Sequence, residues 1–166
     1  AAIDGAVFDK TGTLTTGQPR VKTTTIPHGS NAALAKALAS RSVHPAARAL
    51  VKYFIEEPLV ELFEVHEVPG CGIEATHHGK AIRLGRSAWV AEIAKESLNG
   101  APAQGVAFAI AGKQLYLSQL AETLRPDGRW MVDTFQSQKI PCRILSGDQD
   151  CFVACIAASL GVAGYR

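Results

Sequence analysis

The stretch from residue 7 to residue 15 constrains the fold of this chain most strongly, because it places a carboxylate directly after a buried strand. A short apolar run at residues 6–8 predicts the end of such a strand, and Asp9 follows it at once. The carboxyl ends of strands are where open α/β sheets place their ligands and chemistry. Gly12 lets the backbone turn tightly and approach a phosphate, although Asp, Gly and Thr are also common in ordinary turns. A carboxylate so placed can attack phosphorus and form an acyl phosphate, so the stretch predicts nucleophilic chemistry at Asp9.

The full string that begins at Asp9, Asp-Lys-Thr-Gly-Thr-Leu-Thr, resembles the phosphorylation motif of the P-type ATPases, which are ion pumps that pass through an aspartyl phosphate. The resemblance implies that Asp9, Lys10 and Thr11 belong to the catalytic site, and that Asp9 and Thr11 contribute to a Mg²⁺ site. In soluble phosphatases of the same haloacid dehalogenase-like superfamily, the residue two after the nucleophile is usually a second Asp that acts as general acid and base. Thr11 cannot take up that proton at neutral pH, so an acyl phosphate on Asp9 should persist, as a pump requires.

Two later segments also resemble motifs of this family, and they follow the first motif in the expected order along the chain. Residues 140–145 predict a short strand, and Ser-Gly-Asp follows at positions 146–148, which resembles the Thr-Gly-Asp of the family. The resemblance implies that Ser146 and Asp148 belong to the catalytic site, with the Ser146 hydroxyl reaching the phosphoryl group. The return hinge of the family reads Asp-x-x-Arg-Pro; here Glu122 stands in place of the Asp, and Arg125 is retained.

The residues between these segments predict a separate body of antiparallel strands with helices. Helical patterns near residues 30–40 and from Pro45 onward are followed by strand-like segments joined by glycine-containing turns. We therefore predict an α/β fold in which a doubly wound domain is interrupted by an antiparallel-sheet insert with flanking helices. By the resemblance, residues 1–19 and 121–166 form a discontinuous and incomplete haloacid dehalogenase-like phosphorylation domain, and residues 20–120 form the nucleotide-binding domain.

Two motifs in residues 20–120 bear on nucleotide binding. Residues 42–45 read Ser-Val-His-Pro and resemble the Ser-Glu-His-Pro of heavy-metal-transporting P-type ATPases, in which the His packs against adenine and the Glu hydrogen-bonds it. Val43 has no polar atom, so it cannot make that contact. Alone, a single His or a Gly-x-Gly turn is a weak signal, but the Gly-Cys-Gly turn at positions 70–72 also looks like the turn that lines the nucleotide pocket of these pumps. The resemblance implies that ATP or ADP is bound by His44, Gly70, Gly72 and Ile73.

Composition excludes several other classes of protein. The apolar content of 47% is that of a globular chain, and the net charge of +2 gives no case for nucleic acid or a membrane surface. The sequence has neither an apolar run of 18 residues that could span a bilayer nor a signal peptide. Four cysteines show no disulfide framework and fit a reducing compartment. Cys151 and Cys155, four residues apart, are predicted to be core thiols rather than metal ligands.

The resemblance implies the ATP-binding and phosphoryl-accepting cytoplasmic portion of a heavy-metal pump, copper by analogy, in the inner or plasma membrane of the cell. ATP would phosphorylate Asp9 with Mg²⁺ as cofactor and so drive metal transport. The partners would be ATP or ADP, the transmembrane and actuator parts of the same pump, and a metal ion that this portion does not bind; no nucleic acid is expected. In the family a Lys and a Gly-Asp-Gly-x-Asn-Asp motif follow beyond the position of Arg166. We therefore expect a piece of a longer protein that is inactive by itself.

Two alternatives remain open from the residues alone. One is a soluble haloacid dehalogenase-like phosphatase with a large cap, against which Thr11 argues. The other is a non-catalytic nucleotide-sensing module, which the position of the chain's end and Val43 both suggest.

Overall fold

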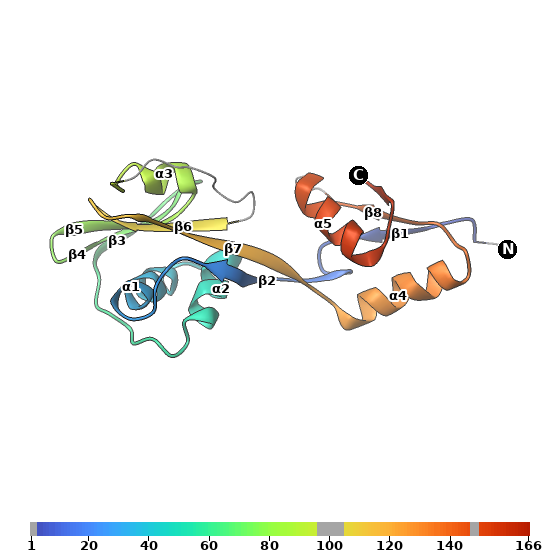
Figure 1. The fold of residues 1–166 in the computed structure, drawn as a ribbon, viewed down its shortest axis with the longest axis horizontal. Helices are drawn as coiled ribbons and strands as arrows, with labels where there is room; N and C mark the ends of the chain where they lie inside the picture. Colours follow the sequence, from blue (N-terminus) through green and yellow to red (C-terminus); the bar gives the residue numbers. More distant parts are fainter. Residues whose placement is uncertain (1–2, 96–104, 147–149) are drawn as a thin grey trace. The chain divides into compact units, whose positions relative to one another are not determined.

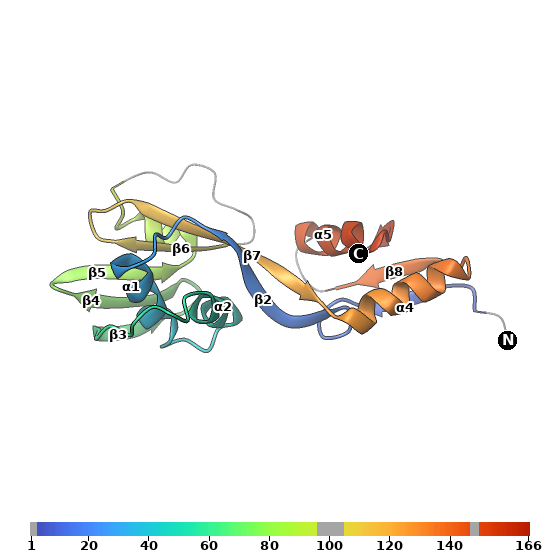
Figure 2. The ribbon, with the colours of Figure 1, turned by 60° about the horizontal axis from the view of Figure 1, so that its bottom comes forward.

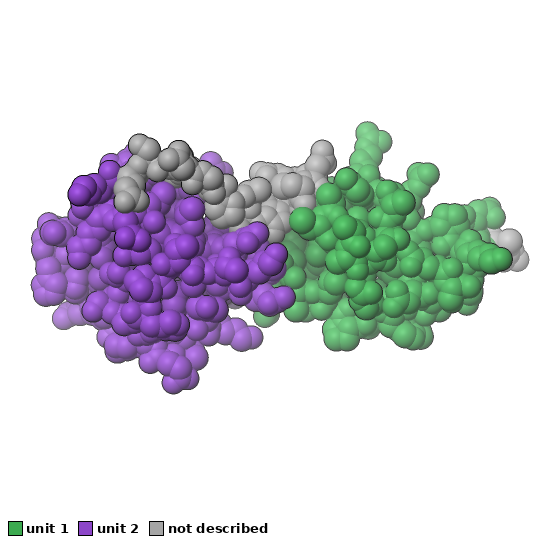
Figure 3. All heavy atoms as spheres, viewed as in Figure 1, with its two compact units in different colours: residues 1–18, 122–166 green, residues 19–121 purple. Residues whose placement is uncertain are grey.

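The computed structural model describes residues 3–95, 105–146 and 150–166, with the side chains of residues 150–152 left out. The chain divides into two compact units, which Figure 3 colours separately. Unit 1 comprises residues 1–18 and 122–166, and unit 2 comprises residues 19–121. Asp148, which the resemblance assigns to the catalytic site, lies outside the described residues.

Unit 1 contains a parallel sheet in the order β1-β8-β9, of which Figure 1 labels β1 and β8. The chain enters on β1, continues through unit 2, and returns through helix α4, strand β8, helix α5 and strand β9. Phe8 and Ile144 are Cα partners on β1 and β8, and both are buried against Val132 of α4 and Val153 of α5. This small core holds the carboxyl ends of β1 and β8 side by side. The elements are β1 (Ala6–Asp9), α4 (Pro126–Ser137), β8 (Cys142–Leu145), α5 (Asp150–Leu160) and β9 (Gly164–Tyr165).

Unit 2 is built on a six-stranded sheet in the order β2-β7-β6-β5-β4-β3. The neighbouring strands from β3 to β7 pair antiparallel. Figure 1 shows α1 and α2 below this sheet and α3 above it, and in the turned view of Figure 2 α1 and α2 come to the front. The strands are β2 (Thr15–Thr24), β3 (Phe63–Val68), β4 (Gly72–His77), β5 (Lys80–Gly85), β6 (Gly105–Ile110) and β7 (Leu115–Leu124); the helices are α1 (Ser30–Ala39), α2 (Pro45–Tyr53) and α3 (Ser87–Ala91).

Strand β6 explains why helices cover both faces of this sheet. Side chains alternate between the two faces of a strand, yet every side chain from Ala107 to Ile110 is apolar and buried. Phe108 belongs to the core formed with α1 and α2, whereas Ala107 packs in the cluster around Val90 of α3. The predicted mixed α/β architecture with an antiparallel insert is confirmed.

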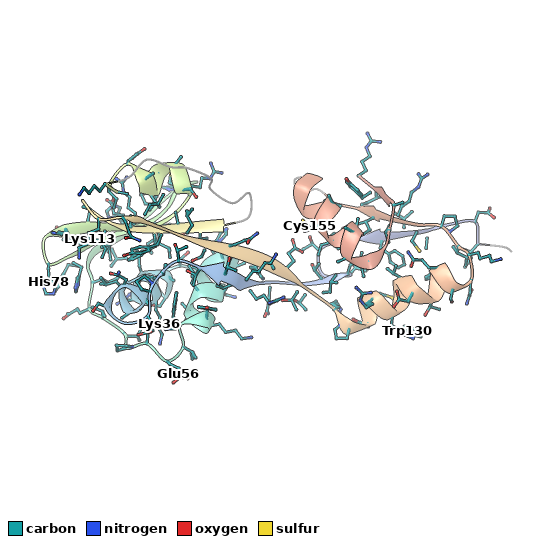
Figure 4. The ribbon with its side chains drawn as sticks, viewed as in Figure 1. Lys36, Glu56, His78, Lys113, Trp130 and Cys155 are labelled. Carbon is teal, nitrogen blue, oxygen red and sulfur yellow. The ribbon has the colours of Figure 1, made fainter. Side chains whose placement is uncertain are left out.

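One polar cluster ties the loop after α2 to α1. The Lys36 side chain, labelled in Figure 4, is buried, and its Nζ donates hydrogen bonds to the carbonyl oxygens of Ile55 (2.7 Å) and Glu57. The Glu57 carboxylate accepts hydrogen bonds from the His28 ring (2.8 Å) and the Gly29 N–H (3.2 Å), and these bonds lower the pKa of Glu57 below its ordinary value. These contacts hold the loop that follows the end of α2 at Tyr53.

The prediction that Cys155 is a core thiol is wrong. Cys155 is exposed on α5, where Figure 4 labels it. The buried positions of this helix are Val153, Ile156, Ala157 and Leu160, a helical stripe that turns position 155 toward solvent. The side chain of Cys151 lies outside the described residues.

Among the described residues, no helix is both long enough and apolar enough to cross a lipid bilayer.

Candidate functional site

Asp9 and Ser146 lie at the same edge of the unit 1 sheet. Asp9 ends β1 and is the Cα partner of Leu145, which ends β8, and Ser146 is the next residue. Because β1 and β8 run parallel, both residues stand at carboxyl ends of strands. Asp9 is exposed and Ser146 is half-buried. The fold therefore presents a carboxylate and a hydroxyl-bearing residue at the edge where α/β sheets bind their ligands.

The turn after β1 is held by backbone hydrogen bonds that converge on Lys10. The Lys10 N–H donates to the Leu145 carbonyl (3.1 Å), and the Lys10 carbonyl accepts from the N–H groups of Leu14 (3.1 Å) and Thr15 (3.0 Å). Gly12 has a φ of 80°, which a residue with a side chain rarely adopts. The turn leaves Thr11 exposed two positions after Asp9.

The Lys10 side chain is completely buried, and its ammonium group forms an ion pair with Glu122, 112 residues later. Glu122 lies on β7 and is the first residue of unit 1 after the return from unit 2. Its Oε1 accepts from Lys10, and its buried Oε2 has no hydrogen-bond partner within the described parts of the chain. The pair joins the turn beside Asp9 to the returning strand.

Arg125 makes a second link between the same two segments. Its N–H donates to the Leu14 carbonyl (2.9 Å), and its guanidinium donates to the Gly12 carbonyl (3.4 Å). The guanidinium also forms two hydrogen bonds with the Asp127 carboxylate, at 3.0 and 2.8 Å. This pairing lowers the pKa of Asp127 and raises the pKa of Arg125. Arg125 therefore fastens the start of α4 to the turn that follows Asp9.

The oxygen atoms in this region suit a hard divalent cation. Asp9 offers a carboxylate, and Thr11 offers a carbonyl and a hydroxyl, both at exposed positions. The described residues contain no group of three or more His, Cys, Asp or Glu side chains that could hold a metal ion by themselves. A Mg²⁺ site does not need such a group of side chains, because Mg²⁺ commonly takes one or two carboxylates together with waters and substrate phosphate oxygens.

In unit 2, His44 forms the N-cap of α2. Its Nδ1 accepts a hydrogen bond from the Ala46 N–H (3.2 Å), so the ring is held in one orientation, with the proton of the neutral ring on Nε2. The His44 N–H donates to the Ser42 hydroxyl oxygen (3.2 Å), which fixes the turn before the helix. His44 is exposed, and so is Val43, with 78% of its surface accessible. An exposed imidazole with a fixed edge offers a flat surface on which an aromatic ring can stack.

The glycine turn at positions 70–72 connects β3 to β4, and Gly72 is the first residue of β4. Gly72 has a φ of 152°, and a Cβ at this position would lie 2.2 Å from the Leu84 carbonyl oxygen. Glycine is therefore required for β4 and β5 to approach each other here. The next residue, Ile73, is buried in the core of unit 2, with 4% of its surface exposed, so its side chain serves packing. His44 and the glycine turn both belong to unit 2, whereas Asp9 and Ser146 belong to unit 1.

Sequence reasoning missed the partner of Lys10 and the carboxylate beside Ser42. Glu122 stands in the hinge motif, but no spacing rule connects it with a lysine 112 residues earlier. Glu67 on β3 accepts a hydrogen bond from the Ser42 hydroxyl (3.3 Å), and no motif singled it out.

Comparisons with known proteins agree with this architecture. A family model described as "Hydrolase: haloacid dehalogenase-like hydrolase" matches residues 3–166. The chain is 33% identical over 163 residues to nitrogen fixation protein FixI of Rhizobium leguminosarum bv. viciae, a match that covers 98% of this chain and 21% of that protein. It is 27% identical over 173 residues to a copper-exporting P-type ATPase of Mycobacterium tuberculosis, covering 97% of this chain and 22% of that protein. The chain thus spans about a fifth of the length of these curated relatives.

A solved structure of the catalytic domain of the CPx-ATPase CopB-B, which concerns conformational changes upon nucleotide binding, is similar along nearly the whole chain. The TM-score is 0.71 at 26% sequence identity, and the match covers 99% of this chain and 62% of that one. The resemblance to heavy-metal P-type ATPases that the motifs predicted is confirmed by these similarities.

Proposed function

The chain belongs to the haloacid dehalogenase-like hydrolase family, and from this membership we propose that it is the ATP-binding and phosphoryl-accepting portion of a heavy-metal P-type ATPase. The proposal rests on Asp9, which is exposed at the carboxyl end of β1, while Thr11 occupies the position two residues later. A carboxylate at that later position could activate water against the acyl phosphate. A threonine cannot, so the phosphorylated form of Asp9 lasts long enough to be coupled to another event.

In the phosphorylation step, an Asp9 carboxylate oxygen attacks the γ-phosphorus of ATP, and ADP leaves. The Ser146 hydroxyl donates a hydrogen bond to a phosphoryl oxygen, and Asp148, two positions later in the sequence, is proposed as a further catalytic residue. Lys10 acts by positioning: its ammonium group is buried against Glu122 and holds the turn that carries Asp9 and Thr11. Asp9 and Thr11 would supply oxygen ligands to Mg²⁺, which when bound neutralises charge on the transferred phosphoryl group.

Unit 2 would bind the nucleotide. The exposed His44 ring stacks on the adenine, and the turn with Gly70 and Gly72 allows the nucleotide to approach the backbone. Ile73 forms part of the floor beneath that turn. The similarity to the CopB-B catalytic domain, whose structure concerns nucleotide binding, supports this assignment.

For the whole protein, we propose a pump in the inner or plasma membrane with this portion on the cytoplasmic side. The similarity to copper-exporting P-type ATPases supports a heavy-metal ion, copper by preference, as the transported substrate. The transmembrane and actuator parts of the same pump would be the partners of this portion, and ATP hydrolysis through Asp9 would drive transport.

Phosphorylation is tested in the membrane protein that carries this chain. Incubation with labelled ATP and Mg²⁺ should give an acid-stable, hydroxylamine-sensitive label in the wild type and none in Asp9→Asn. Thr11→Asp should shorten the lifetime of the label, because it restores a general base. A wild type that accumulates no label but rapidly turns over p-nitrophenyl phosphate would instead be a phosphatase.

Nucleotide binding is tested by titrating the 166-residue chain with ATP while amide chemical shifts are recorded. Shifts should cluster around His44 and at residues 70–73. His44→Ala should weaken binding, and Val43→Glu should tighten it by adding a hydrogen bond to a charged group, worth about 1.5–3 kcal/mol. His78→Asn, at an exposed histidine on the β4–β5 turn, is the matched control and should bind as the wild type does. Unchanged ATP affinity in His44→Ala would show that the site lies elsewhere.

A further inference from the structure

We propose that Glu67 on β3 reads the base of the nucleotide, accepting a hydrogen bond from the exocyclic amino group of adenine and disfavouring guanine. This inference rests on the nucleotide site proposed above for unit 2. It assigns a specificity-determining residue to a chain that has valine at position 43, where the related pumps carry a glutamate.

A short chain of hydrogen bonds ties Glu67 to the segment that carries His44. The Ser42 hydroxyl donates to Glu67 Oε1 (3.3 Å) and accepts from the His44 N–H (3.2 Å). Ser42 therefore holds the Glu67 carboxylate on the side of β3 that meets the start of α2. Within the described residues Ser42 hydrogen-bonds Oε1 of this exposed carboxylate, which leaves the second oxygen, Oε2, available to a ligand.

The register of the sheet places Glu67 beside the glycine turn. Glu67 is the Cα partner of Ile73, and Val68 is the partner of Gly72. Partner side chains in an antiparallel pair lie on the same face of the sheet, and Ile73 packs in the core with α1 and α2. Glu67 therefore lies on the helix-covered face. Since β3 is the edge strand, Glu67 stays exposed there, between the His44 segment and the turn.

A register shift in β3 decides this orientation. The pairing of β3 with β4 shifts between Phe63 and His66, where Glu64 has a φ of 51°. A shift of one residue moves every later side chain of a strand to the opposite face. Without the shift, Glu67 would lie on the same face as Phe63, four residues earlier; with it, Glu67 shares the face of Ile73 and accepts a hydrogen bond from Ser42. Glu64, at the irregularity, instead receives a hydrogen bond from Thr76 (2.8 Å).

The chemistry of the two purines explains how a carboxylate in this place discriminates. An ionised carboxylate only accepts hydrogen bonds. Adenine presents an amino donor at its six-position, whereas guanine presents a carbonyl acceptor there. Glu67 would therefore bond adenine and repel guanine. Val43 is 78% exposed and apolar, so it can neither accept a hydrogen bond from adenine nor repel the guanine carbonyl.

The test compares ATP and GTP binding to the full 166-residue chain by amide chemical shifts. The wild type should prefer ATP by tenfold or more. Glu67→Gln should reduce that preference roughly tenfold, because it removes a charged acceptor and introduces an amide that can donate to guanine. Glu67→Ala should weaken ATP binding, and because it removes the repulsion of the guanine carbonyl it should improve GTP binding, though less than Glu67→Gln does. The matched control is Glu61→Gln, at an exposed glutamate just before β3, which should leave both affinities unchanged.

The outcomes separate this inference from the proposed function. If ATP binds with shifts at residues 70–73 but Glu67→Gln and Glu67→Ala keep the wild-type ratio of affinities, Glu67 does not read the base and the nucleotide site stands. If ATP causes no shifts in that region of the wild type, the nucleotide site is wrong and the role of Glu67 falls with it. Unchanged amide spectra of the ligand-free variants establish that both remain folded.

Discussion

Replacing Lys10 with methionine tests whether the buried pair with Glu122 holds the turn beside Asp9 to the returning strand. Methionine keeps most of the buried stem of Lys10 and removes its charge. The Lys10 side chain is 0% exposed and that of Glu122 is 25% exposed. Loss of the ammonium group therefore removes the ion-pair partner of a largely buried carboxylate.

The expected loss in the free energy of unfolding follows from the burial of this ion pair. Removing one partner from a buried ion pair typically costs about 3–5 kcal/mol, because the other charge stays buried and uncompensated. Since a quarter of the Glu122 side chain reaches solvent, we expect a loss near the lower end, about 3 kcal/mol, in the free energy of unfolding of unit 1. Replacing both members with apolar residues is often close to neutral. The double variant Lys10→Met/Glu122→Leu should therefore be more stable than Lys10→Met alone.

Urea unfolding followed by amide peak intensities measures both units in one sample. Ile144 on β8 reports on unit 1, and Ile82 on β5 reports on unit 2. Lys10→Met should lower the unfolding midpoint at Ile144 and leave the midpoint at Ile82 unchanged. The reasoning is refuted if Lys10→Met costs less than about 0.5 kcal/mol, the range of ordinary surface substitutions, or if the double variant is less stable than the single one.

Three further predictions concern other parts of the chain. Gly72→Ala should destabilise unit 2 more than Gly79→Ala, because a Cβ at Gly72 would strike backbone atoms whereas one at Gly79 has open space; thermal unfolding of the two variants compares them. Glu57 has a lowered pKa, so its contribution to stability is present above its unfolded pKa of about 4.3 and is lost as the pH falls through its folded pKa. The stability difference between the wild type and Glu57→Gln should therefore shrink from pH 6 to pH 3, and a constant difference would contradict the assigned hydrogen bonds. Burial raises the pKa of the Cys142 thiol, so iodoacetamide at pH 8 should label exposed Cys155 faster, as mass spectrometry of digests would measure.

Local signals were sufficient wherever the structure depends on neighbours in the chain. Helix α5 (Asp150–Leu160) is specified by local features, namely the apolar spacing of its residues and the glycine that follows. Asp9 ends β1 as predicted, since an apolar run followed by a turn specifies a strand end. The motif that begins there was specific enough to identify the family.

Tertiary structure decided the features that depend on distant contacts. The sequence pattern alone did not mark Lys36 as a buried residue, because its partners are carbonyls 19 and 21 residues later. It did not pair Lys10 with Glu122, because 112 residues separate them. Nor did it orient Glu67, because a shift of register in β3 sets the face on which that carboxylate lies. Periodicity and turn chemistry act over a few residues, so the sequence by itself determined the place of Asp9 at the end of β1 and the bounds of α5. The partners of buried charges were decided when the chain folded back on itself.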